Sequence, residues 1–144
     1  MKNKNEMTMN FDADSVNEGF ARLAVAAFAA ALNPTLDELA DIKTAVSEAV
    51  TNSIIHGYDG REGKVYLGAK IEGRMFSVSI RDEGKGIADI NKARQPFYTT
   101  RPELERSGRG FAFMEAFMDE VYVESEQGKG TTIIMKKTIG RRDE

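Results

Sequence analysis

Residues 47–57 constrain the fold of this chain most, because they place polar chemistry on an otherwise ordinary amphipathic helix. Apolar residues recur at helical spacing over residues 36–54 and define a face that turns toward a core. Glu48 and Asn52 fall on a different stripe, one turn apart, so a carboxylate and a carboxamide leave the same face. A solvated helix surface has the same pattern. The glycine clusters further along the chain decide between the two interpretations.

Composition narrows the classes of protein to which the chain can belong. Its 144 residues suffice for one compact domain, so we expect residues 1–144 to form a single domain. The net charge is −3 and the basic residues are dispersed, which argues against a nucleic-acid-binding surface. No apolar run is long enough to cross a bilayer, so we expect a soluble, cytoplasmic protein. Because the chain has no cysteine and one histidine, any metal would be a hard cation such as Mg²⁺ on oxygen ligands.

The rest of the chain combines short strands with helices. Ser15 and Glu18 have the spacing of a capping box, which predicts the start of a helix that continues to about residue 32. Pro34 breaks that helix, and a second helix runs to His56, where Gly57 supplies the C-terminal stop. The other predicted elements are strands at 7–11, 65–71, 76–80, 121–123 and 131–137, a helix at 111–118, and a loop at 95–107 of a length typical of functional or disordered segments.

Three Gly-x-Gly pairs mark the second half of the chain, at 84/86, 108/110 and 128/130. Each pair alone is weak evidence, since glycines serve in turns and helix caps as well as at ligands. For the third pair a plain turn is the simpler interpretation. Neither the P-loop pattern nor Gly-x-Gly-x-x-Gly can be written anywhere in the chain, so the P-loop and Rossmann hypotheses fail.

The remaining polar groups have the chemistry of a different nucleotide site. Residues 107–110 precede a helix, and a glycine-rich helix start presents free N–H groups and a positive dipole end to a phosphate. Asp82 follows a strand, where its carboxylate could accept a hydrogen bond from an exocyclic amine such as that of adenine. Asn52 offers a neutral oxygen ligand to Mg²⁺, which keeps most of its water and phosphate ligands.

The order of these motifs carries more weight than any one of them. Glu-x-x-x-Asn, Asp-x-Gly-x-Gly, Gly-x-Gly and Gly-x-Gly-Thr follow one another over about residues 36–132. This series resembles the nucleotide-binding domain shared by gyrase-type topoisomerases, the Hsp90 chaperone, histidine kinases and the MutL repair protein. The resemblance implies an α+β fold, a two-layer α/β sandwich whose mixed, mostly antiparallel sheet carries helices on one face. A histidine kinase would also need a phosphoacceptor helix pair, and residues 1–35 are too few and hold no histidine.

Four runs narrow the resemblance, at 47–52, 54–58, 93–96 and 102–108. They are similar to the anti-sigma-F factors of spore-forming bacteria, which are serine-protein kinases. That likeness implies a homodimer that binds ATP or ADP with Mg²⁺, holds a sporulation sigma factor inactive and phosphorylates a serine of an anti-anti-sigma protein. Two alternatives stay open: the related general-stress anti-sigma kinase, and a nucleotide-gated sigma-binding module with little kinase turnover.

The resemblance also implies roles for individual residues. Glu48 would orient or deprotonate the attacking serine hydroxyl, and Arg106 would reach the γ-phosphate or a partner. Asn52 would be the protein ligand of Mg²⁺. Arg22 would contact the sigma factor, although a snorkelling surface residue explains Arg22 equally well.

The nucleotide itself would be held by a larger set of residues. Asp82 would select adenine, and residues 95–110 would form a lid over the phosphates. The other nucleotide-binding residues that the resemblance implies are Gly84, Gly86 and Thr131 around the base, and Ser107, Gly108 and Gly110 around the phosphates, with Thr99 and Thr100 from the lid.

Two charges depart from the family pattern. Arg109 lies between the lid glycines, where such enzymes commonly carry an apolar residue, and Lys85 adds a charge to the turn on the base side. Arg109 could strengthen phosphate attraction or disturb the packing of the lid. His56 has no phosphoacceptor context, and we expect it to cap or pack the helix end.

Overall fold

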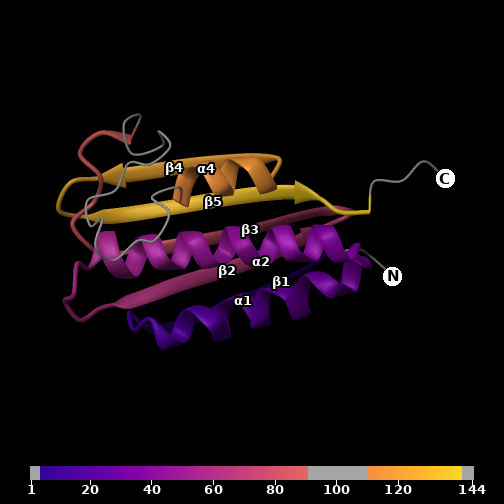
Figure 1. Ribbon diagram of the computed structural model, residues 1–144, viewed down its shortest axis with the longest axis horizontal. Coiled ribbons are helices and arrows are strands. Elements are labelled where there is room, and N and C mark those ends of the chain that lie inside the picture. Colours follow the sequence, from indigo (N-terminus) through magenta and orange to yellow (C-terminus); the bar gives the residue numbers. More distant parts are fainter. Residues whose placement is uncertain (1–3, 91–109, 141–144) are drawn as a thin grey trace.

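The computed structural model describes residues 4–90 and 110–140 (Figure 1). Its elements are β1 (Lys4–Asp12), α1 (Val16–Ala29), the short 3₁₀ helix η1 (Ala30–Leu32), α2 (Leu36–Thr51), the π-helix η2 (Asn52–Gly57), β2 (Lys64–Glu72), β3 (Met75–Asp82), α4 (Gly110–Phe117), β4 (Glu120–Glu126) and β5 (Gly130–Thr138). The strands form one five-stranded sheet in the order β1-β2-β3-β5-β4. Helices α1, α2 and α4 lie on one face of it, which confirms the predicted two-layer α+β sandwich.

Each strand of this sheet is antiparallel to its neighbours. The prediction of a mostly antiparallel sheet is therefore confirmed, and the described strands include no parallel pair. The β2–β3 and β4–β5 connections are tight turns at Gly73 and Gly128, both with positive φ, and connections this short permit only antiparallel pairing.

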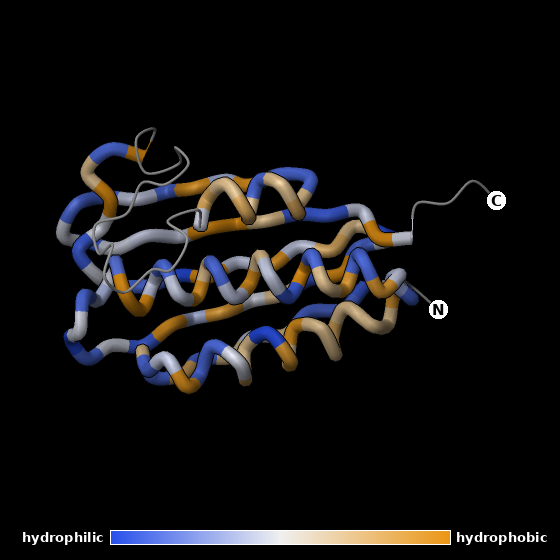
Figure 2. Tube along the Cα trace, in the orientation of Figure 1, coloured by the Kyte–Doolittle hydropathy of each residue, from blue (hydrophilic) through white to orange (hydrophobic). Residues whose placement is uncertain are grey.

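The inner face of the sheet carries the core. On β2 the side chains that alternate toward the helices, Val65 to Ile71 in steps of two, are at most 4% exposed. Leu67 pairs with Ile80 on β3, which in turn pairs with Ile133 on β5, so one apolar row crosses three strands. Apolar positions alternate with polar ones along the strands in Figure 2, as expected for a sheet with one solvated face.

Helix α2 packs at the centre of the helix layer, between α1 and α4. Its inward stripe includes Ile42, Val46 and Val50, each 0% exposed, which confirms the apolar face that the sequence predicted. A capping box fixes its start: the backbone N–H of Glu38 donates to Thr35 Oγ1 at 3.0 Å, and the N–H of Thr35 donates to Glu38 Oε1 at 2.9 Å.

The capping box predicted at the start of α1 does not form. Ser15 does precede the helix, but its backbone is already helical (φ −57°, ψ −25°), so its hydroxyl makes no capping bond. Asp14 serves instead, since its carboxylate accepts the N–H of Val16 at 3.0 Å. The carboxylate of Glu18 is used elsewhere: it accepts a hydrogen bond from Ser47 Oγ on α2 at 2.6 Å and pairs with Arg22 at 3.0 Å.

Helix α4 is tied to the sheet at its C-terminal end. The ammonium of Lys137, on β5, donates to the carbonyl of Phe117 at 2.8 Å and lies 3.8 Å from the carboxylate of Asp41 on α2. A cation at this end complements both the free carbonyl and the helix dipole. Phe111 and Met114 bury the inner side of the helix, and so the first residue of α4 is held against α2.

The helix that begins at Leu36 ends at Gly57, as predicted, but its last six residues form a π-helix. The N–H of Tyr58 donates to the carbonyl five residues earlier, that of Ser53, at 2.9 Å. A π turn carries one more residue than an α turn, and such segments occur frequently at functional sites. The periodicity of the sequence gave no sign of it.

Candidate functional site

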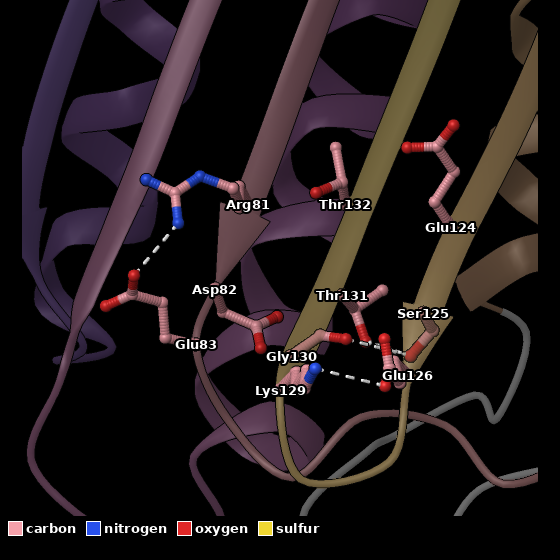
Figure 3. Close-up of a pocket in the computed structure, with 10 residues that line it drawn as sticks. All are labelled: Arg81, Asp82, Glu83, Glu124, Ser125, Glu126, Lys129, Gly130, Thr131 and Thr132. Carbon is pink, nitrogen blue, oxygen red and sulfur yellow. Dashed lines mark hydrogen bonds and ion pairs between the residues drawn. The ribbon is translucent and has the colours of Figure 1, made fainter.

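Three polar side chains replace apolar ones at one end of the inner sheet face. Cross-strand pairing places Thr131 on β5 opposite Asp82 on β3 on one side and opposite Ser125 on β4 on the other. We call Asp82, Thr131 and Ser125 the polar row. Figure 3 shows the polar row beside a hollow of about 320 Å³ at the ends of these strands, which is also lined by Arg81, Thr132 and Glu124 from the opposite, solvated face of the sheet. Polar side chains in the buried face of a sheet need partners, so the row is a candidate binding site.

Asp82 is the one acid of the polar row, and it is 2% exposed. Its Oδ1 accepts the N–H of Gly84 at 2.9 Å. Among the residues that the structure describes, none donates a hydrogen bond of standard geometry to its Oδ2, and the neighbouring hydroxyl of Ser53, 1% exposed, forms none either. Buried polar atoms are nearly always satisfied, so an orphaned carboxylate oxygen is suited to a donor that arrives with a ligand.

Burial also sets the electrostatics of this carboxylate. Loss of solvent raises the pKa of Asp82 above its ordinary value, because the charged form is penalised in a low-dielectric environment. The N–H of Gly84, the nearby hydroxyl of Ser53 and the N–H of Thr131 offset part of this effect by stabilising the charge. In the absence of a ligand the protein therefore holds a carboxylate in an unfavourable place, as functional sites often do.

Two glycines allow the π-helix and the turn after β3 to touch. A Cβ on Gly84 would lie 2.1 Å from the carbonyl oxygen of Gly57, and a Cβ on Gly57 would lie 2.8 Å from the carboxyl carbon of Asp82. The N–H of Lys85 donates to the carbonyl of Gly57 at 2.9 Å and locks this contact. The end of the helix is therefore pressed against the carboxylate of Asp82, which fixes its position.

The β4–β5 turn closes the same site from the other side. Gly130 has a φ of +113°, and a Cβ there would lie 2.1 Å from the carbonyl oxygen of Asp82. A Cβ on Gly86 would likewise lie 2.3 Å from the carbonyl oxygen of Glu126. By contrast Gly128 has open space around it and a φ of +83°, as expected for a turn glycine, and its N–H donates to the carbonyl of Lys85 at 2.7 Å. Gly84 and Thr131 thus adjoin Asp82, whereas Gly86 lies against the β4–β5 turn.

Tyr58 supports this turn, and the sequence analysis assigned it no role. Its hydroxyl accepts the N–H of Glu83 at 2.8 Å and donates to the carbonyl of Lys64 at 2.5 Å. Burial raises the pKa of Tyr58, so the phenol stays protonated and able to donate. The available sequence signal for this role was a tyrosine directly after a helix-ending glycine. Its hydrogen-bond partners are distant in the chain, since Lys64 begins β2 and Glu83 follows β3.

Glu48 and Asn52 lie on α2 and at the first position of η2, both half-buried. A Cβ on Gly110 would come within 3.6 Å of Glu48 Oε1, so the carboxylate of Glu48 faces the first residue of α4. Glu48 therefore faces the helix start that the sequence associates with phosphate. The other predicted residues of that end, Thr99, Thr100, Arg106, Ser107, Gly108 and Arg109, and most of the predicted lid fall outside the described residues.

Two further charged residues have definite surroundings. Lys85 pairs with Asp59 at 3.7 Å, both partly exposed, so the unexpected charge is directed to the turn after the π-helix. Such surface pairs contribute at most about 1 kcal/mol. Arg22 lies on α1 with its side chain 45% exposed and does not line the hollow beside the polar row.

The described residues contain neither a cluster of metal ligands nor a membrane-spanning helix. Within residues 4–90 and 110–140, no three acidic, histidine or cysteine side chains are grouped to share a metal ion. Mg²⁺ commonly uses one or two protein ligands and takes the rest from water and phosphate, which leaves Asn52 a suitable oxygen donor. In the described part of the chain, no helix has the length and apolar character of a membrane span.

Comparison with known proteins agrees with this fold and site. A family model described as the histidine kinase-like ATPase domain matches residues 9–137. The chain is 60% identical over 137 residues to the anti-sigma F factor of Halalkalibacterium halodurans, covering 94% of each chain. It is 59% identical over 139 residues to that of Geobacillus thermodenitrificans and 58% identical over 134 residues to that of Clostridium acetobutylicum, in each case covering more than nine-tenths of both chains.

The fold and the family match together define an ATPase domain of the histidine-kinase type. Within that class, the chain is identical to anti-sigma F factors at about three residues in five along nearly its whole length. The chain belongs to the anti-sigma F factor family.

Proposed function

We propose that this protein binds ATP through the polar row and acts as an ATP-dependent anti-sigma factor and protein-serine kinase. The observation that carries the proposal is the orphaned Oδ2 of buried Asp82, beside a glycine turn that the π-helix holds in place. The adenine amino group supplies the donor that this oxygen lacks, and a guanine carbonyl would repel it. The relatives named anti-sigma F factor support a sigma factor as the protein partner.

The kinase step rests on the Glu48–Asn52 pair. Asn52 would hold Mg²⁺ through its amide oxygen, and the ion would supply positive charge to the phosphates of the nucleotide. Glu48, which faces the start of α4, accepts the proton of an attacking serine hydroxyl from an anti-anti-sigma protein. Gly110 and the glycine-rich residues before it cradle the phosphates, Arg106 stabilises the charge on the transferred phosphoryl group, and the products are ADP and phosphoserine.

The exposed face of α1 supports a protein partner and a homodimer. Val16, Phe20 and Leu23 recur at helical spacing and are 75%, 59% and 61% exposed, so they form one apolar stripe on the surface. Arg22 lies beside this stripe. Large apolar side chains gathered on one exposed face are typical of interaction surfaces. We assign this stripe to a second copy of the chain, with Arg22 at the contact with a sporulation sigma factor.

The decisive experiment is incubation with labelled ATP, Mg²⁺ and a candidate anti-anti-sigma protein. Label on a serine of that protein is the expected result, and ATP binding without transfer would favour a nucleotide-gated sigma-binding module instead. A sigma factor pull-down with and without ATP tests the second half of the proposal. Retention that does not depend on nucleotide would contradict it, and the identity of co-purified partners separates a sporulation regulator from a general-stress one.

A further inference from the structure

The hydroxyl of Ser125 lies where three segments of the site meet. It accepts the N–H of Ile87 at 2.7 Å, which joins β4 to the turn that follows Gly84 and Gly86. It also lies 3.0 Å from the carbonyl oxygen of Gly130 and 2.8 Å from Thr131 Oγ1 (Figure 3). Ser125 itself lies at the far end of the polar row from Asp82. None of the motifs that predicted the nucleotide site includes it.

Counting protons shows what Ser125 can control. A serine hydroxyl has one proton, and here two acceptors compete for it, Gly130 O and Thr131 Oγ1. If the proton goes to Gly130, Thr131 must donate to Ser125 and faces the site only as an acceptor. If it goes to Thr131, the proton of Thr131 is free to donate into the site. Ile87 fills a lone pair of Ser125 in both arrangements.

The edge of adenine that faces Asp82 requires the second arrangement, in which Thr131 donates into the site. Adenine presents its amino group as a donor and, next to it, the ring nitrogen N1 as an acceptor. Asp82 Oδ2 is free to accept from the amino group, so the neighbouring residue must donate toward N1. Thr131 is 4% exposed and directly opposite Asp82, which makes it that neighbour.

We propose that Ser125 is a positioning residue for base recognition, which orients the hydroxyl of Thr131 as a donor toward N1 of adenine, directly or through one water. This inference rests on the proposed binding of ATP at the polar row. Ser125 does not touch the base itself. It acts through Thr131, and the bond from Ile87 holds its oxygen at the required point.

The test compares ATP with 1-deaza-ATP, in which a C–H replaces N1, by titration calorimetry. We expect Ser125→Ala to bind ATP about 3- to 10-fold more weakly than wild type, the loss of one hydrogen bond. Wild type and Ser125→Ala should bind 1-deaza-ATP equally, because the contact that Ser125 prepares is absent from that ligand. Ser125→Thr retains the hydroxyl and should retain ATP affinity.

Matched controls separate recognition from folding. Ser77→Ala removes a hydroxyl from the opposite, solvated face of the sheet and should change neither affinity. In a Thr131→Val background, Ser125→Ala should have no further effect on ATP affinity. If Ser125→Ala weakens both ligands equally, or neither, the inference is overturned. Wild-type protein that binds no ATP would contradict the proposed function, whereas wild-type protein that binds ATP and 1-deaza-ATP equally would overturn only the role of Ser125.

Discussion

The two ends of the candidate site are built in opposite ways. At the end around Asp82, which we call the base end, backbone touches backbone: a Cβ on Gly84 would come within 2.1 Å of the carbonyl oxygen of Gly57. At the transfer end, a Cβ on Gly110 would meet no described residue closer than Glu48 Oε1 at 3.6 Å, an ordinary contact. Selecting one base requires fixed groups, whereas phosphoryl transfer to a second protein requires room for that protein. The contrast predicts that substitutions at the two ends will fail in different ways.

The largest effect is expected at the transfer end. Glu48→Gln keeps the shape of the side chain but removes the base, so phosphoryl transfer should fall by about 10²- to 10⁴-fold while ATP affinity stays within a few-fold. Transfer of labelled phosphate and calorimetric titration measure the two quantities. Glu72→Gln, an exposed carboxylate at the far end of β2, is the matched control. Undiminished transfer by the Glu48 variant would remove its catalytic role.

Asp82→Asn should mainly affect binding. Asparagine keeps the acceptor for the Gly84 N–H but replaces the charged Oδ2 with an amide that faces the adenine amino group donor to donor. We expect ATP affinity to fall about 10- to 100-fold, the usual worth of a charge-assisted hydrogen bond. Calorimetry with ATP and GTP gives both affinity and base preference. An unchanged preference for ATP would show that Asp82 does not select the base.

The same variant should be more stable than wild type when no nucleotide is bound. The raised pKa of Asp82 means that the folded state binds a proton more tightly than the unfolded state does. Stability of the wild type therefore falls as pH rises from the unfolded pKa through the folded one, and the cost is fully present above the folded pKa. Asp82→Asn removes that cost. Its advantage in urea unfolding should be clear at pH 7 and disappear on acidification below the ordinary aspartate pKa.

A comparison of Gly84→Ala with Gly110→Ala tests whether the base end is more rigid than the transfer end. The added methyl at Gly84 meets backbone that cannot move aside, so we expect a loss of about 1–3 kcal/mol in the free energy of unfolding. At Gly110 the neighbour is a side chain at contact distance, and stability should stay within about 1 kcal/mol of wild type. Urea titration of both variants gives the comparison. Equal losses would mean that the base end is no more rigid than the transfer end.

The smallest effect on the folded protomer is expected on α1. Phe20→Ser alters a side chain that is 59% exposed, so unfolding should change by no more than about 0.5 kcal/mol. Self-association should nevertheless weaken about tenfold or more, because exposed aromatics often dominate interfaces. Sedimentation equilibrium measures it, with Leu36→Ser, 85% exposed at the start of α2, as the control. An unaltered association constant would exclude the α1 stripe as the homodimer contact.

Much of the fold was predictable because it depends on local periodicity. The alternation along β2 and β3 gave the hairpin and its buried face, and the helical spacing gave the core face of α2. The wrong prediction of a capping box at the start of α1 also came from a local pattern. The spacing of Ser15 and Glu18 matches a capping box, yet the backbone of Ser15 is helical and Glu18 bonds to Ser47 on another helix.

The sequence by itself determined which groups are candidates for the chemistry: Glu48 and Asn52 one turn apart, and Asp82 before a glycine turn. Their spacing is a property of the local chain, so no partner segment is needed to define it. Tertiary structure alone decided what surrounds them. The register of β3, β5 and β4 aligned Asp82 with Thr131 and Ser125, and the π turn pressed Gly57 against Gly84. Such contacts join segments distant in the chain, and they are fixed only when the helix layer packs on the sheet.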